Sequence, residues 1–216
     1  MARYSKRKRV VRRRFRRVPY GRKIRRTRYS KRNGNLYCKL SLLETKVHKI
    51  NQNEVQGLQI IPHLFREYNN LGPSFESCTF LKSRVTIYPV ANVSNNSTSR
   101  MPTYCVFPWK KEAPIRTLYQ DYLSIDRAKV FRGTQVGRMS FVPCVNIPAG
   151  TSGDALLSIT KWRPTLQWQS DTTKQPNLWT GAVCFQGLLE GDTTSCEYVI
   201  RTDVWVRFNR QSLMGA

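Results

Sequence analysis

Hydrophobic and polar residues alternate with a period of two in several segments of this chain. The alternation is plain at Thr45-Lys-Val-His-Lys-Ile50, and the segments 78–90 and 195–209 combine it with many aromatic and β-branched residues. A period of two is the pattern of a strand with one buried face, and these residue types favour sheets. The pattern therefore predicts that the chain folds mainly as β-structure.

Turn and loop residues divide the chain into about eight predicted strands. The predicted strands are 36–50, 55–64, 78–90, 103–107, 128–132, 136–145, 177–189 and 195–209. With long loops and hardly any helix, this set favours an all-β sandwich or barrel. A single eight-stranded jelly roll fits both the strand count and the uneven loop lengths.

The segments between the predicted strands are mostly loops. Residues 65–70 are expected to form a short helical turn, whereas 69–73 is expected to be a loop. Residues 146–177, which contain several Pro and Gly, are also expected to be loop-rich. The connection Glu190-Gly-Asp-Thr-Thr194 has the composition of a hairpin turn that would join the last two strands. Loops of this length in a small domain usually contact other molecules.

Charge is distributed very unevenly. The chain has 37 Lys or Arg and 13 Asp or Glu, for a net charge of +24, and 17 of the basic residues lie in the first 32 positions with no acidic residue among them. Such a segment repels itself and has too little apolar surface to offset the entropy of ordering. We expect residues 1–32 to be a disordered basic arm and 33–216, starting at the Asn33-Gly-Asn35 turn signal, to be the folded domain.

The basic arm has the composition of a nucleic-acid-binding tail. The Arg guanidinium matches phosphate geometry, and the interspersed rings of Tyr4, Phe15, Tyr20 and Tyr29 suit stacking on single-stranded bases. Such binding should be indifferent to sequence and strongly dependent on salt. The residues predicted to bind nucleic acid are Lys6, Arg7, Lys8, Arg9, Arg12, Arg13, Arg14, Phe15, Arg16, Arg17, Arg22, Lys23, Arg25, Arg26, Arg28, Lys31 and Arg32.

The same clusters also fit the pattern of a nuclear localisation signal, because import receptors read runs of Lys and Arg. The residues predicted for this role are Lys6, Arg7, Lys8, Arg9, Arg12, Arg13, Arg14, Arg16 and Arg17. A secretory signal is not expected, since no apolar core follows the basic residues. No run of about 18 apolar residues is present, so membrane insertion is not expected either.

The sequence shows no convincing catalytic arrangement, and an enzyme is not expected. It has no phosphate-binding loop ending in Lys-Ser/Thr, no G-x-S-x-G and no H-E-x-x-H. The acidic pairs Asp121 with Asp126 and Glu190 with Asp192 could hold a metal ion, but solvated turn carboxylates are the preferred interpretation. No cofactor or metal is expected.

The six cysteines are interpreted as buried thiols in a reducing environment. They lack metal-site spacing, and the chain has only two histidines to complete a zinc site. Cys184 and Cys196 could face each other on adjacent strands, although the spacing does not imply a disulfide. The cysteines are Cys38, Cys78, Cys105, Cys144, Cys184 and Cys196, and the histidines are His48 and His63.

In the order and length of its segments, the chain resembles the capsid proteins of circoviruses and cycloviruses. The matching segments are Arg12-Arg-Arg-Phe-Arg-Arg17, Lys31-Arg-Asn-Gly34, Lys82-Ser-Arg-Val-Thr-Ile-Tyr-Pro89, Gln175-Pro-Asn-Leu-Trp179 and Glu197-Tyr-Val-Ile-Arg-Thr-Asp-Val-Trp-Val-Arg-Phe208. The likeness spans the chain from end to end, and the closing strand is its most telling part. The short body favours the cyclovirus side.

This resemblance implies a viral-capsid jelly roll that assembles in 60 copies into a T=1 icosahedral shell around a circular single-stranded DNA genome. It also implies binding to host nuclear import receptors, attachment of virions to cell-surface glycosaminoglycans, and localisation to the virion and the host nucleus. The long loops would then form subunit contacts and the outer surface of the shell.

Two other functions are compatible with a basic extension on a β body. A ribosomal or other RNA-binding protein is the main alternative, although such proteins usually spread basic charge over the body, whereas residues 33–216 carry only +7. Assembly into large uniform particles would separate the two. A metal-dependent nuclease is the third, and it would cleave DNA on addition of magnesium or manganese.

Overall fold

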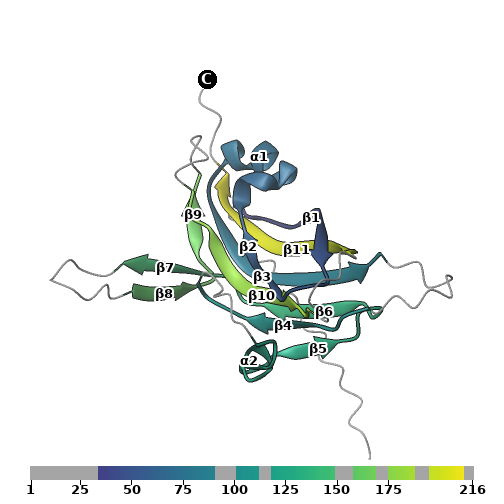
Figure 1. Ribbon diagram of the computed structural model, residues 1–216. Coiled ribbons are helices and arrows are strands. Elements are labelled where there is room, and N and C mark those ends of the chain that lie inside the picture. Colours follow the sequence, from purple (N-terminus) through teal and green to yellow (C-terminus); the bar gives the residue numbers. More distant parts are fainter. Residues whose placement is uncertain are drawn as a thin grey trace, which may run out of the picture. The chain divides into compact units, whose positions relative to one another are not determined.

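The computed structural model describes residues 34–90, 101–111, 118–148, 158–168, 175–187 and 195–211 (Figure 1). Within these ranges the chain forms eleven strands and two short α-helices, so the predicted all-β class is confirmed, but the strand number exceeds the expected eight. The strands are β1 Leu36–Lys49, β2 Glu54–Ile60, β3 Phe75–Pro89, β4 Tyr104–Pro108, β5 Lys129–Phe131, β6 Gly137–Phe141, β7 Cys144–Pro148, β8 Ser158–Trp162, β9 Thr165–Gln167, β10 Leu178–Phe185 and β11 Ser195–Gln211.

The helices occupy two of the connections. α1 (Arg66–Leu71) lies between two 3-10 turns, Pro62–Leu64 and Gly72–Ser74, and α2 (Gln120–Leu123) precedes β5. The helical turn expected at 65–70 is confirmed, but the loop expected at 69–73 is wrong, because α1 continues to Leu71 and the second 3-10 turn follows it. Neither α-helix among the described residues is long or apolar enough to cross a membrane.

The strands form two antiparallel sheets. The first has the order β1-β11-β3-β6, with β9 also pairing with β3. The second has the order β5-β4-β10-β7-β8, with β2 also pairing with β10. The β1–β11 ladder is continuous from Leu36 opposite Phe208 to Lys49 opposite Ser195. In the first sheet the central strands are therefore β11 and β3, which are also the longest.

Buried aromatic side chains join the sheets. Tyr104 on β4, Phe185 on β10 and Tyr198 on β11 have ring centroids 4.5–5.9 Å apart, in tilted or edge-on arrangements that aromatic pairs prefer. A second cluster joins Tyr68 of α1 to Phe80 and Phe208, at centroid distances of 6.0 and 6.1 Å. All six of these aromatic residues are fully buried, so the hydrophobic core lies between the sheets.

The last two strands do not form the predicted hairpin. β10 pairs with β2, β4 and β7 in the second sheet, whereas β11 pairs with β1 and β3 in the first. The alternation in each segment identified a strand, but it carries no information on the partner. The proposed turn residues 190–194 themselves lie outside the described residues.

The region expected to be loop-rich, residues 146–177, contains regular structure. β7 and β8 pair from Cys144 opposite Trp162 to Pro148 opposite Ser158, and Figure 1 shows this pair of strands extending away from the other strands of the second sheet. β9 adds to the edge of the first sheet. The single strand expected at 136–145 is likewise divided into β6 and β7, because Pro143 cannot donate a ladder hydrogen bond.

Candidate nucleic-acid interface

The residues predicted to bind nucleic acid and to direct nuclear import lie between Lys6 and Arg32, outside the described residues. The described chain begins at Gly34, whose φ of 62° is left-handed and suits glycine in a turn. Next to it, Asn35 Oδ1 accepts a hydrogen bond from the backbone N–H of Arg210 at 3.2 Å. The basic arm is thus continuous in sequence with the end of the first sheet where β1 begins.

A polar pocket of about 520 Å³ opens at this end of the sheet. Asn209 Nδ2 donates to Thr79 Oγ1 at 2.9 Å, and Arg210 lies 3.5 Å from Glu76. The Nε of Arg207, which also lines the pocket, is buried without a hydrogen-bond acceptor among the described residues. A buried guanidinium N–H without an acceptor is costly, so the pocket is suited to an added anionic oxygen.

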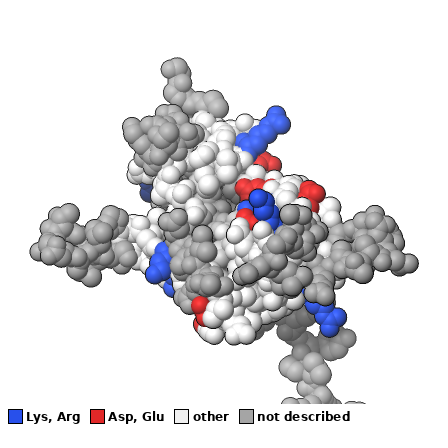
Figure 2. Space-filling view, viewed as in Figure 1, with Lys and Arg blue, Asp and Glu red and all other residues white. Residues whose placement is uncertain are grey.

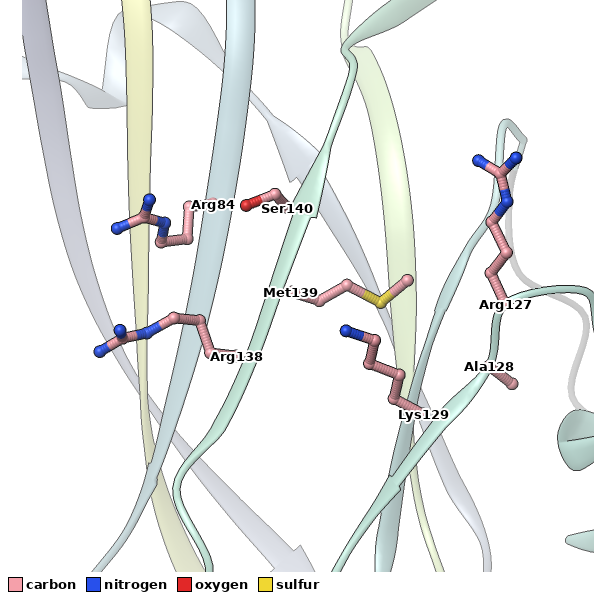
Figure 3. Close-up of a pocket in the computed structure, with 7 residues that line it drawn as sticks. All are labelled: Arg84, Arg127, Ala128, Lys129, Arg138, Met139 and Ser140. Carbon is pink, nitrogen blue, oxygen red and sulfur yellow. The ribbon is translucent and has the colours of Figure 1, made fainter. Parts of the chain in front are cut away.

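A second hollow, of about 670 Å³, lies between the edge strands β5 and β6 and has a strongly basic rim (Figure 3). Its cations are Arg84 from β3, Arg138 from β6, and Arg127 and Lys129 at β5. Met139 lies between Lys129 and the β6 backbone in the close-up. The lining contains no carboxylate, which makes the hollow attractive to anions.

Figure 2 shows the charged side chains on one face of the body. In the view of Figure 2, the described Lys and Arg side chains stand apart among uncharged residues, and some lie beside Asp or Glu. That face offers no continuous basic surface among the residues shown in colour.

The acidic pair Asp121 and Asp126 shows no sign of a metal site. Asp126 is 91% exposed and lies 3.6 Å from Arg127, as expected for a solvated turn carboxylate. Among the described residues, no group of three or more His, Cys, Asp or Glu side chains could hold a metal ion. The other pair, Glu190 and Asp192, lies outside those residues.

The buried histidine His48 has a structural environment. Its Nδ1 lies 3.2 Å from Glu54 Oε2, and its Nε2 lies 3.2 Å from the Gln186 carbonyl oxygen. Lys46 forms an ion pair with the same carboxylate. Burial raises the pKa of Glu54, but the hydrogen bonds from Lys46 and His48 and their charges outweigh it, so the pKa is lowered. This cluster ties β1 to the start of β2.

No disulfide joins any of the six cysteines, all of which are described. Cys184 faces Cys105 on the neighbouring strand β4, not Cys196, which belongs to the other sheet. The suggestion that Cys184 and Cys196 face each other on adjacent strands is therefore wrong, because β10 and β11 lie in different sheets. Burial raises the pKa of Cys38 and of Cys144, which disfavours reactive thiolates at these positions.

The β7–β8 hairpin carries apolar side chains that the sequence did not single out. Ile159 is 61% exposed and Trp162 is 49% exposed, and Ile147 is also exposed. Lys110 Nζ lies 4.3 Å from the centroid of the Trp162 ring. Clustered exposed apolar side chains on a projecting element are typical of a surface that another protein chain covers. Only knowledge that residues 158–162 form a strand could have revealed them.

Comparison with known proteins identifies the class. The fold is similar to that of the BFDV capsid protein in a 60-mer crystal structure, with a TM-score of 0.58 and 15% identity, covering 84% of this chain and 98% of that one. A decameric form of the BFDV capsid protein gives a TM-score of 0.53 and 12% identity, covering 81% and 99%. The body therefore has the fold of a viral capsid protein.

Sequence comparison identifies the family. The model of the circovirus capsid protein family matches residues 2–212. The capsid protein of Human associated cyclovirus 1 is 38% identical over 184 residues, which are 83% of this chain and 84% of that protein. This chain belongs to the circovirus capsid protein family, as the resemblance in its sequence indicated. Its role is that of a structural protein of the virion.

Proposed function

We propose that this capsid protein assembles in sixty copies into a T=1 shell and packages circular single-stranded DNA through residues 1–32. Family membership supports the shell, and the arm's one-signed charge is the observation that carries the packaging role. The BFDV relative forms a 60-mer, which supports the copy number. In this proposal residues 33–216 form the shell domain.

The charge of sixty copies is compatible with a small genome. The 17 basic residues of each arm give 1020 positive charges per shell, and the net charge of +24 per chain gives 1440. With one phosphate per nucleotide, neutralisation corresponds to a single strand on the order of one to two kilobases.

Strand pairing supports an eight-stranded jelly roll as the shell-forming unit. When the β7–β8 hairpin and the short strand β9 are set aside, the remaining strands pair as β1-β11-β3-β6 and β2-β10-β4-β5. The three additional strands then form an insertion between β6 and β10. Its exposed Ile159 and Trp162 would be buried against a second copy of the chain.

Two further roles are part of the proposal. The clusters from Lys6 to Arg17 would bind host nuclear import receptors before assembly and DNA afterwards. Attachment to cell-surface glycosaminoglycans would use basic side chains on the outside of the shell. The protein would accordingly occur in the virion and in the host nucleus.

The proposal is tested by expressing three forms of the chain: full length, lacking residues 1–32, and with those residues scrambled in order. Negative-stain microscopy scores particles, and nuclease-protected nucleic acid scores packaging. Full-length and scrambled chains should form uniform filled particles, because the arm binds through charge rather than sequence. Chains without the arm should package little or nothing. A monomer in all three cases, or equal filling without the arm, would contradict the proposal.

A further inference from the structure

The outer face of the first sheet, directed away from the core, carries an unusual set of side chains. Leu40, Val85 and Val204 point into the core, so their neighbours in sequence point outward. Between the paired positions Tyr37–Arg207 and Leu43–Arg201, six cations lie on the outward positions of the four strands. They are Lys39 on β1, Arg201 and Arg207 on β11, Lys82 and Arg84 on β3, and Arg138 on β6. We call these six residues the cationic face.

The register places a tryptophan in the middle of the cationic face. Trp205 lies directly opposite Lys39 on one side and Lys82 on the other. Lys82 Nζ lies 5.5 Å and Arg84 Cζ 5.2 Å from the centroid of the Trp205 ring. Cation–π contacts of this kind hold the two charged groups over the sheet. Trp205 therefore acts as a positioning residue for two of the cations.

Arg84 and Arg138 extend the cationic face to the edge of the sheet. Arg84 is paired with Ser140 and Thr86 with Arg138, so the two arginines are diagonal neighbours on one face. Figure 3 shows their side chains directed to the same side of the β3 and β6 ribbons, away from Met139. Two guanidinium groups held side by side repel each other, and a bound anion relieves that repulsion.

The cationic face has little internal neutralisation. Among the described residues between Tyr37 and Leu43 of β1 and the residues paired with them, the one outward carboxylate is Asp203. Its Oδ1 lies 3.1 Å from Arg201 Nε and 3.4 Å from Lys39 Nζ. The other four cations form no ion pair with a carboxylate of the described residues. One of them is Arg207, whose buried Nε has no acceptor there.

The position of the cationic face favours DNA as its ligand. It ends at Tyr37 and Arg207, which are paired, and Tyr37 lies five residues after the last cation of the basic arm. Tyr37 is 65% exposed and is therefore available for stacking on an unpaired base. A sulfated glycan has no base that could stack on this ring. From Tyr37 to Leu43 the face is about 20 Å long at the rise of a strand.

We propose that the cationic face is a second binding surface for packaged single-stranded DNA, with Lys82, Arg84, Arg138 and Arg207 on phosphates and Tyr37 stacked on a base. This inference rests on the proposed packaging of DNA. In this proposal the basic arm binds the DNA at no fixed position, whereas the cationic face binds it at a defined position on each subunit.

The first test compares two triple variants of the full-length chain in binding to an oligo-dT of about 30 nucleotides. The test variant is Lys82→Gln with Arg84→Gln and Arg138→Gln. The control replaces three exposed cations elsewhere on the body. The control substitutions are Arg66→Gln, Arg132→Gln and Lys161→Gln. Loss of three phosphate contacts should reduce the slope of log K against log salt by about 2 in the test variant, and by clearly less in the control.

The outcome separates this inference from the proposed function. If wild-type particles fill but the two triple variants bind and package alike, the cationic face is not a DNA site. If wild-type particles remain empty, the proposed function fails first. If the test variant binds oligo-dT normally but intact particles lose retention on heparin, the cationic face binds sulfated glycans outside the shell, and the inference is overturned.

A second test examines stacking at Tyr37, whose side chain is exposed, so that neither substitution removes a core contact. Tyr37→Leu should weaken oligo-dT binding about fivefold or more, whereas Tyr37→Phe should preserve it. Binding of an abasic oligonucleotide with the same phosphates should be equal for both variants. Equal oligo-dT affinity of the Tyr37→Leu and Tyr37→Phe variants would contradict stacking at this position.

Discussion

Asp203 is the residue at which stability and DNA binding should respond in opposite directions. Its Oδ1 accepts hydrogen bonds from Ser41 Oγ at 2.7 Å and Arg201 Nε at 3.1 Å, and Lys39 Nζ lies at 3.4 Å. The carboxylate is largely buried, whereas the two cations are about 40% exposed. It therefore joins β1 to β11 while neutralising part of the cationic face.

Asp203→Asn should lower the free energy of unfolding by about 1–2 kcal/mol at pH 7. The amide oxygen can still accept from Ser41, so the loss comes from the two charged partners, whose contribution is reduced by solvent screening. Oligo-dT binding should become tighter, with a salt slope steeper by about 1, because Lys39 and Arg201 are released to phosphate. Urea titration and fluorescence anisotropy on one preparation provide both values.

The pH dependence gives a further check on Asp203. Burial raises the pKa of this carboxyl, but hydrogen bonds from Ser41 and Arg201 and the charges of Arg201 and Lys39 outweigh it and lower the pKa. The stabilisation is therefore present above the unfolded pKa of about 3.9 and is lost as pH falls through the folded value. The difference between wild type and variant should shrink below about pH 4. A variant as stable as wild type at pH 7, or one that binds DNA more weakly, would refute the reasoning.

Three other predictions concern packing, thiols and assembly. Gly181→Ala should destabilise the body by about 1–3 kcal/mol or more in urea titration, since the added Cβ would lie 2.6 Å from the Phe107 carbonyl oxygen; an unchanged midpoint would contradict this packing. At pH 8 a thiol alkylating reagent should modify at most Cys38 before unfolding, because the other five thiols are buried; mass spectrometry counts the adducts, and more than one on native protein would contradict it. Ile159→Ser with Trp162→Ser should reduce particle formation without lowering the unfolding midpoint of the unassembled chain; wild-type particle yield on sizing would exclude the hairpin from the subunit interface.

Local pattern was sufficient for most of the strands. β1 and β11 were predicted nearly to their ends, because each carries a long alternation that one buried face requires. Pairing was not predictable in the same way. The short connection between β10 and β11 suggested a hairpin, yet the two strands lie in different sheets, where each buries its apolar side chains against the other sheet.

The functional residues also fall into two groups: those that composition alone identifies and those that only the strand pairing brings together. The basic arm could be recognised from composition alone, since a block of charge needs no fold to attract a polyanion. The cationic face could not be recognised in this way, because its residues come from four strands and lie up to 168 positions apart in sequence, from Lys39 to Arg207. Only the register of β11 against β1 and β3 places Lys39, Trp205 and Lys82 side by side. The nearest sequence signal was the outward series Arg201, Trp205 and Arg207.

The most direct test of the account is the mass of particles formed by the full-length chain, together with the length of the nucleic acid they protect. Sixty chains of 25.2 kDa amount to about 1.5 MDa of protein. Charge neutralisation predicts a protected single strand on the order of one to two kilobases in addition. A particle of that protein mass filled with such a strand is the predicted result. A small soluble oligomer, or a shell of that mass that stays empty in the presence of single-stranded DNA, would contradict the account.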